Sequence, residues 1–225
     1  ESDNHALRGA AALRPGGTLL TSAVEHPAIL NTCRRLEAEG HRVGVICDLP
    51  GTPGYNEDMA SGLTASLSLG LHRVKMQREV GLSDILGAGR ILKIIKELQP
   101  DVLHGHGAKG GVYARALGSL VRAERSRVAR LYSPHGGSLH YDPASRAGQV
   151  YFRAERMLER LTDHILFVAE YERRTYAQKI GEPSCAWSVN YNGLTDEEFE
   201  IVTPADGAAD FLFLGEMRIL KGPDL

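Results

Sequence analysis

The sequence lacks an apolar run of the roughly 20 residues that a membrane-spanning helix needs, so we expect no such helix. Its three cysteines, Cys33, Cys47 and Cys185, lack the spacing of a metal site or a redox motif, which favours reduced thiols in a cytoplasmic protein. Excess charge is also missing: the formal net charge is −2, so nothing global indicates a nucleic-acid partner. The polar first residues are not a signal peptide, and without an initiator Met we expect a trimmed or spliced chain.

What the sequence does have is a regular alternation of short apolar segments with amphipathic ones. We predict strands at 18–24, 42–47, 70–76, 101–104, 129–133, 164–169, within 184–191 and at 210–214. We predict helices at 27–39, 83–98 with Ser83 as its N-cap, 109–123, 149–161 and from 170 to about 180. Repeated strand–helix units with nearly continuous apolar strands predict an α/β fold, a Rossmann-like parallel sheet with helices on both faces.

Ligands of such sheets bind beyond the carboxyl ends of the strands, so the residues after each strand are the candidates for a site. A glycine-rich turn at 105–111 follows one strand and contains Gly110, with His104 and His106 beside it and Lys109 adding charge. Glycines allow a ligand to approach the backbone, and a helix N-terminus attracts anions. The other interpretation is a tight strand–helix turn with two incidental histidines.

Two more residues follow predicted strands. His135, in a Pro-His-Gly-Gly segment, has an imidazole able to hydrogen-bond a sugar hydroxyl or a phosphate oxygen near neutral pH. The alternative is a histidine packed between turns. Glu170 opens a helix, where a carboxylate either contacts a ligand or only favours the helix dipole.

Five segments, in this order, resemble the family-four retaining glycosyltransferases of the GT-B fold. They are PDVLHGHGAKGG, YSPHGG, LTDHILFVAEYERRTY, VNYNGL with DEEF, and FLFLGEMRILKG, and the resemblance runs from about residue 40 to the end. It implies a metal-free, cofactor-free transfer of sugar from a nucleotide-sugar to a glycan or lipid-linked acceptor, with retention. It also implies that residues 43–202 are the acceptor-binding domain, and that 203–225 are a linker and the first strand of a truncated donor domain.

The same resemblance assigns roles to individual residues. It makes His135 catalytic, His104, His106, Lys109 and Gly110 acceptor-binding, and Glu170, Arg218 and Lys221 donor-binding. Three features depart from the family: Glu25-His26-Pro27 stands in place of a Gly-Gly turn, Ala169 stands where serine is frequent, and the donor domain's glutamate pair is absent.

Residues 1 to about 42 resemble instead a segment of the cysteine desulfurases, which are class V aminotransferases. The matching text is ESDNHALRGAA and TLLTSAVEHPAILNTCRRLEAEGHRV, in which His26 matches a histidine that stacks on pyridoxal phosphate. A lysine segment for the Schiff base is not found, so pyridoxal chemistry has no anchor. We interpret the chain as a chimera in which a desulfurase-like βαβ segment completes the sheet.

Three functions therefore compete: half of a glycosyltransferase, an inactive recombined or isolated scaffold domain, and a pyridoxal-phosphate enzyme fragment. The helix at 149–160 adds peripheral contact with the inner face of a membrane as a further interpretation, because it carries Arg153, Arg156 and Arg160 beside apolar residues. Glu155 and Glu159 partly offset these arginines, which favours a plain amphipathic helix with a solvated face.

Overall fold

The computed structural model describes residues 15–22, 27–48, 67–75, 82–123, 128–191, 199–203 and 205–209, and single positions 9, 12 and 64. The chain divides into two compact units, Glu1–Gly193 and Leu194–Leu225, and every helix and strand given below belongs to the first. The predicted strand at 210–214 and the turn residues Glu25 and His26 lie outside the described residues. No helix among the described residues combines the length and the apolar character needed to cross a bilayer.

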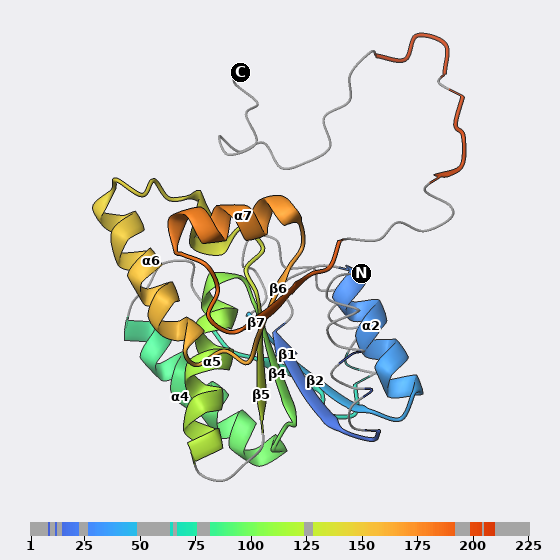
Figure 1. Cartoon of the computed structure of the whole chain (residues 1–225). Helices are drawn as coiled ribbons and strands as arrows, with labels where there is room; N and C mark the ends of the chain where they lie inside the picture. The colour runs from blue at the N-terminus through green and yellow to red at the C-terminus, as the bar shows by residue number, and fades with distance from the viewer. Residues whose placement is uncertain are drawn as a thin grey trace. The chain divides into compact units, whose positions relative to one another are not determined.

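The first unit is built on one sheet in which all neighbouring strands are parallel (Figure 1). The strands are β1 (Thr18–Ser22), β2 (Arg42–Cys47), β3 (Leu71–Arg73), β4 (Val102–His106), β5 (Ala129–Ser133), β6 (His164–Phe167) and β7 (Ala186–Val189). Their order in space is β3-β2-β1-β4-β5-β6-β7. The predicted Rossmann-like α/β fold is therefore confirmed.

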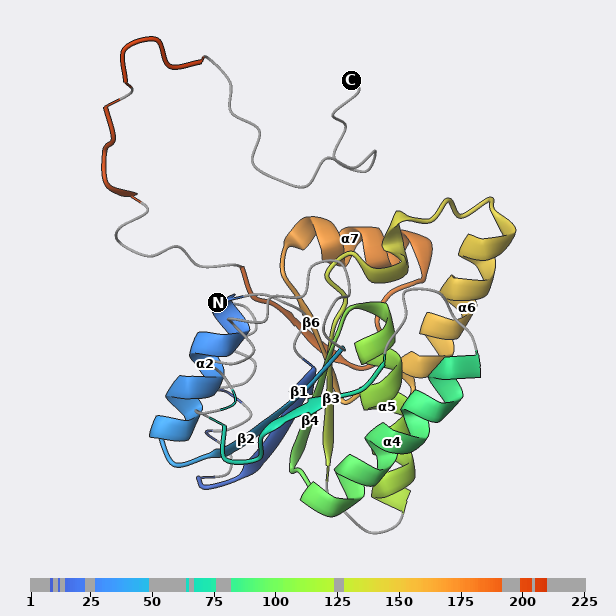
Figure 2. The same ribbon diagram turned by 180° about the vertical axis from the view of Figure 1, so that it is seen from behind.

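Helices cover both faces of this sheet (Figures 1 and 2). They are α2 (Pro27–Ala38), α4 (Leu82–Leu98), α5 (Gly107–Ala123), α6 (Arg146–Glu159) and α7 (Glu170–Lys179), with a short 3₁₀ helix η1 (Gly137–His140). Successive strand residues point to opposite faces. Accordingly Leu19 packs in one core with Leu36 of α2, whereas Leu20 packs in another with Ile95 of α4.

Two predicted helix starts are wrong. Helix α4 begins at Leu82, so Ser83 lies inside it and is not its N-cap. Helix α6 begins at Arg146 instead of residue 149, because Ser145 caps it: the Ser145 hydroxyl accepts a hydrogen bond from the Gly148 backbone amide at 3.0 Å.

The predicted glycine-rich turn at 105–111 is also wrong. Strand β4 continues through His106, and α5 begins at the next residue, Gly107, so no loop separates them. Gly107 has a φ of +63°, a conformation that glycine adopts without strain and that lets the strand pass directly into the helix.

Glycines also bring α5 close to the sheet. A Cβ on Gly105 would overlap the carbonyl group of Gly110, and a Cβ on Gly111 would overlap the ring of Tyr132 on β5. Backbone and aromatic ring therefore fill the space that side chains would occupy, which explains these glycines by packing.

We predict that Gly111→Ala lowers the free energy of unfolding by about 1–3 kcal/mol, because the added methyl group forces α5 or Tyr132 to move. The matched control is Gly89→Ala at an exposed position of α4, where an added Cβ meets nothing within 4 Å. That change is expected to raise the free energy of unfolding by up to about 1 kcal/mol through helix propensity. Urea unfolding checks both signs, and equal effects at the two sites would contradict the packing explanation.

Candidate functional site at the carboxyl ends of β4 and β5

Two histidines of β4 lie at the carboxyl end of that strand. His104 and His106 are two residues apart, so their side chains share one face of the sheet. Both are buried, with exposed fractions of 1% and 3%. Their ring centroids are 4.0 Å apart.

His135 follows β5 and reaches the same end of the sheet. Its Nε2 lies 3.0 Å from Nδ1 of His106, within hydrogen-bond distance. The residue has a φ of +49°, and Gly136 and Gly137 after it also have positive φ. Histidine adopts this left-handed region more readily than most residues, and the two glycines adopt it freely. This turn directs the imidazole back toward β4.

Hydroxyl groups of the neighbouring strands contact both β4 histidines. The Thr21 hydroxyl of β1 lies 3.2 Å from Nε2 of His106, and the Ser133 hydroxyl of β5 lies 2.9 Å from Nε2 of His104. Each hydroxyl can donate or accept, so it satisfies either tautomer of the ring. Although three imidazoles lie close together, no three His, Cys, Asp or Glu side chains of the described segments are arranged to hold a metal ion.

Glu172, which the sequence interpretation passed over, holds the turn that carries His135. Its carboxylate accepts hydrogen bonds from the backbone amides of Gly136 at 2.6 Å and Val168 at 3.0 Å. The side chain is buried, with 6% of the residue exposed. Glu172 is the third residue of α7, and a glutamate there commonly reaches back to amides before the helix, so this spacing was the signal that could have identified it.

Glu170, the predicted donor-binding residue, lies at the first position of α7 and pairs with basic residues of the same helix. Arg173 donates to its carboxylate at 2.8 Å, and Arg174 lies 3.5 Å away. The hydrogen bond from Arg173 lowers the pKa of Glu170. Donor contact by Glu170 stays a prediction, and the helix-dipole interpretation is compatible with its position.

Lys109 lies in the first turn of α5, where it pairs with a carboxylate of α4. Its Nζ is 2.8 Å from Oδ1 of Asp84, which also accepts a hydrogen bond from the Tyr113 hydroxyl at 3.1 Å. Burial, and then the charge of Asp84, raise the pKa of Tyr113 to about 12, so that the hydroxyl stays protonated. The Lys109 charge is thus partly balanced within the protein.

A small cavity lies between the sheet and helices α4 and α5. Its volume is about 30 Å³, and its lining includes Leu103, His104, Gly110 and Tyr113. A cavity of this size holds one or two water molecules and is too small for a hexose. His135 is not among its lining residues.

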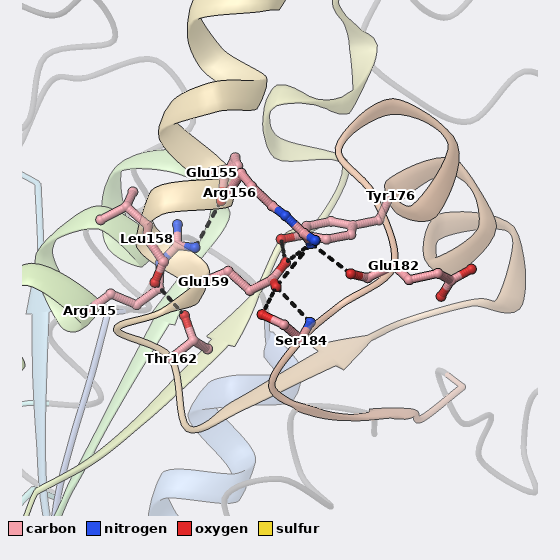
Figure 3. A network of polar contacts seen from close by, with 9 residues as sticks. All are labelled: Arg115, Glu155, Arg156, Leu158, Glu159, Thr162, Tyr176, Glu182 and Ser184. Atoms are coloured by element: carbon pink, nitrogen blue, oxygen red, sulfur yellow. Dashed lines mark hydrogen bonds and ion pairs between the residues drawn. The ribbon is translucent and has the colours of Figure 1, made fainter.

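Buried charges connect α6 to its neighbours (Figure 3). Arg115 of α5 donates to Glu155 at 2.8 Å. One turn later, Glu159 accepts hydrogen bonds from the Tyr176 hydroxyl of α7 at 3.0 Å and from the Ser184 backbone amide at 2.6 Å. Both glutamates are almost fully buried. Glu159 also pairs with Arg156 at 3.1 Å, so it offsets that arginine as expected, whereas Glu155 pairs with Arg115 and offsets none of the arginines of α6.

Tyr132 joins this network to β5, the strand that pairs with β4 and precedes His135. Its hydroxyl donates to Glu155 at 3.1 Å, and the Arg115 guanidinium stacks 3.8 Å from the centre of its ring. Burial, followed by the charge of Glu155, raises the pKa of Tyr132 well above its usual value, which keeps the hydroxyl a donor.

Several predicted site residues therefore converge while others do not. His104, His106 and His135 meet at one end of the sheet, Gly110 and Lys109 lie in the adjoining first turn of α5, and Glu170 pairs locally. Arg218 and Lys221 lie outside the described residues. The assigned contacts with acceptor and donor stay predictions at all of these positions.

A parallel sheet whose polar side chains gather beyond the carboxyl ends of its central strands is typical of the Rossmann-like proteins that bind ligands there. The profile of Glycosyltransferase Family 4 matches residues 28–198, and the chain belongs to this family.

Two solved structures have a similar fold. HepE of Anabaena, solved in complex with UDP and glucose, has a TM-score of 0.51 at 13% identity, covering 79% of this chain and 45% of that one. Sucrose-phosphate synthase of Thermosynechococcus elongatus has a TM-score of 0.50 at 12% identity, covering 78% of this chain and 89% of that one. At such identities the similarity shows the fold alone.

The curated relatives that the chain matches include cysteine desulfurases. IscS of Vibrio vulnificus is 27% identical over 159 residues, which is 70% of this chain and 30% of that enzyme. A shorter match, to IscS of Klebsiella pneumoniae, is 51% identical over 45 residues. The chain thus spans less than a third of these enzymes, and the matches support in part its interpretation as a chimera.

We predict that Glu172→Gln lowers the free energy of unfolding by about 1–3 kcal/mol. The side-chain nitrogen of glutamine is a donor, and it would face one of the two backbone N–H groups from which the carboxylate now accepts hydrogen bonds. Amide hydrogen exchange is expected to rise at Gly136 and Val168 in particular. Glu170→Gln, on the same helix but half-buried and paired with Arg173 and Arg174, is the matched control and is expected to change stability by less than about 0.5 kcal/mol. Unchanged exchange at Gly136 in Glu172→Gln would contradict the role given to this carboxylate.

Proposed function

We propose that this chain is the acceptor-binding half of a retaining glycosyltransferase that transfers a sugar from a nucleotide-sugar to a glycan or lipid-linked acceptor. The observation that carries the proposal is the meeting of His106 and His135, 3.0 Å apart, at the ligand-binding end of the sheet in a chain of this family. His135 is the residue proposed to contact the transferred sugar.

The chemistry proposed for this half is positioning and electrostatic stabilisation. An imidazole held by its neighbours presents a fixed donor or acceptor to a sugar hydroxyl, without reorganisation during the reaction. The first turns of α5 and α7 direct backbone amides toward the end of the sheet where the phosphates of a donor are expected. His104, His106, Lys109 and Gly110 are proposed for the acceptor, and Glu170, Arg218 and Lys221 for the donor. Neither metal nor other cofactor is part of the proposal.

A specific observation made of another protein supports a nucleotide-sugar as the donor. HepE, which shares the fold, was solved with UDP and glucose. The pyridoxal-phosphate alternative draws on the cysteine desulfurase matches. The inactive-scaffold alternative draws on the partial coverage of two similar proteins, 30% of the Vibrio vulnificus desulfurase and 45% of HepE.

We predict that UDP-glucose binds the chain weakly, with a Kd on the order of 1 mM, and shifts the backbone NMR signals of His135 and Gly136 in a saturable manner. His135→Ala is expected to weaken binding about tenfold, the effect of losing one hydrogen bond of about 1.4 kcal/mol. His72→Ala, on β3, is the control and should leave the Kd unchanged, since its ring contacts the Leu69 carbonyl at 2.8 Å.

The alternatives give different results in the same samples. No saturable shift with either UDP-glucose or GDP-mannose would favour the inactive scaffold. A visible absorption band on adding pyridoxal phosphate would favour the desulfurase fragment.

For localisation we propose a cytoplasmic protein that contacts the inner membrane face through α6. Because Glu155 and Glu159 face inward, the outer surface of this helix presents exposed residues at positions 146, 150, 153, 157 and 160, which are Arg, Val, Arg, Met and Arg. Val150 and Met157 are 63% and 70% exposed. Arginines beside exposed apolar residues are suited to an anionic bilayer surface.

We predict that the chain sediments with vesicles containing phosphatidylglycerol and not with pure phosphatidylcholine vesicles. Each arginine near an anionic surface contributes about 1 kcal/mol, so Arg153→Glu with Arg160→Glu should weaken partitioning at least about 30-fold. The same charge change on α2, Arg34→Glu with Arg35→Glu, is the control for net charge. An equal loss in both double variants, or equal binding to both vesicles, would contradict a contact through α6.

A further inference from the structure

His106 has a second feature besides its place near the predicted acceptor site. It is almost fully buried, and both of its ring nitrogens have partners within the protein. Nε2 contacts the Thr21 hydroxyl at 3.2 Å, and Nδ1 contacts Nε2 of His135 at 3.0 Å. Thr21, His106 and His135 thus form one continuous row of hydrogen-bonding groups that runs from β1 across β4 to the turn after β5.

The row constrains where each proton lies. A neutral imidazole has one N–H and one lone pair, so a ring that donates at one nitrogen accepts at the other. The Thr21 hydroxyl carries a single hydrogen and has two acceptors within reach, Nε2 of His106 at 3.2 Å and the carbonyl oxygen of His104 at 3.4 Å. The acceptor to which this hydroxyl donates determines which group is the donor in the Thr21–His106 contact and in the His106–His135 contact.

In the first arrangement, Thr21 donates to the His104 carbonyl and accepts from Nε2–H of His106. Nδ1 of His106 is then the acceptor, and His135 donates from Nε2–H, so its Nδ1 is a lone pair. In the second arrangement, Thr21 donates to Nε2 of His106, and His106 donates from Nδ1–H to Nε2 of His135. The proton of His135 then lies on Nδ1.

We propose that Thr21 and His106 are positioning residues that set the ring orientation and the tautomer of His135. The inference rests on the proposed function, in which His135 contacts the transferred sugar. Because Nε2 of His135 faces His106, Nδ1 is the nitrogen presented to a ligand hydroxyl. The row decides whether Nδ1 accepts a hydrogen bond from that hydroxyl or donates one to it.

The test replaces Thr21, which does not touch His135, and follows both imidazoles. Thr21→Val keeps the shape of the side chain and removes the hydroxyl. Long-range ¹H–¹⁵N spectra of the ligand-free chain report which nitrogen of each histidine carries the proton. We expect the ratio of Nδ1–H to Nε2–H to change roughly fivefold in both His106 and His135, as the loss of one hydrogen bond predicts.

Thr175→Val, which removes a hydroxyl that donates to the Tyr171 carbonyl within α7, is the matched control and should leave both ratios unchanged. If Thr21 had a purely structural role, Thr21→Val would change the free energy of unfolding but would leave the tautomer ratio of His135 unchanged. A change that stops at His106, or no change in either ring, would overturn the proposal.

Substitution of His106 itself separates positioning from folding. In His106→Asn the amide can take the place of Nδ1 toward His135, whereas in His106→Leu nothing can. Among variants whose unfolding midpoint shows them folded, we expect UDP-glucose to bind His106→Asn within about threefold of the original chain. His106→Leu should lose about tenfold, like His135→Ala. Equal loss in both variants would overturn the proposal.

Failure of the proposed function gives a different result. If UDP-glucose shifts no signal even in the original chain, sugar transfer fails as the function. The tautomer response to Thr21→Val still decides whether the row positions His135.

Discussion

The close approach of α5 to the sheet is the constraint on which the candidate site depends. With Gly105 against the Gly110 carbonyl and Gly111 against the Tyr132 ring, β4 passes into α5 without a loop. The strand therefore extends to His106, whose imidazole reaches the turn after β5. Pairing of His106 with Ser133 of β5 holds it in the sheet, in place of the turn that the sequence predicted at this position.

Inward-facing carboxylates then fix the elements around this junction. Glu155 joins α6 to α5, Glu159 joins α6 to α7, and Glu172 joins α7 to the His135 turn. Each accepts hydrogen bonds from more than one N–H or O–H group, which offsets the cost of burying the charge. The positions of α6 and α7 are therefore fixed by polar contacts as well as by the core.

The sequence was sufficient for the fold because apolar periodicity reports burial directly. Strands β2 and β5 and helix α7 follow the predicted ranges closely, and the order of strands and helices agrees. The sequence placed the end of β4 too early because several glycines beside histidines are typical of turns. The close approach of Gly105 to Gly110, which explains these glycines, is a tertiary contact that the sequence does not reveal. Likewise the sequence alone does not distinguish Glu170 from Glu172, since both are glutamates in the first turn of α7. Their roles differ because the backbone amides of Val168 and Gly136 donate to Glu172.

Strand β1 is bonded on both sides, to β2 and to β4, and among the strands that the structure describes no other connects the β2–β3 side of the sheet to the β4–β7 side. The paired residues Leu19 of β1 and Val102 of β4 are separated by more than 80 positions along the chain. Pairing over such a distance is slow, since a long loop must close before the contact forms. Among the described strand pairs, β1–β4 is the one that spans the longest stretch of chain, and the segment that resembles a desulfurase supplies the strand that holds the two sides of the sheet together.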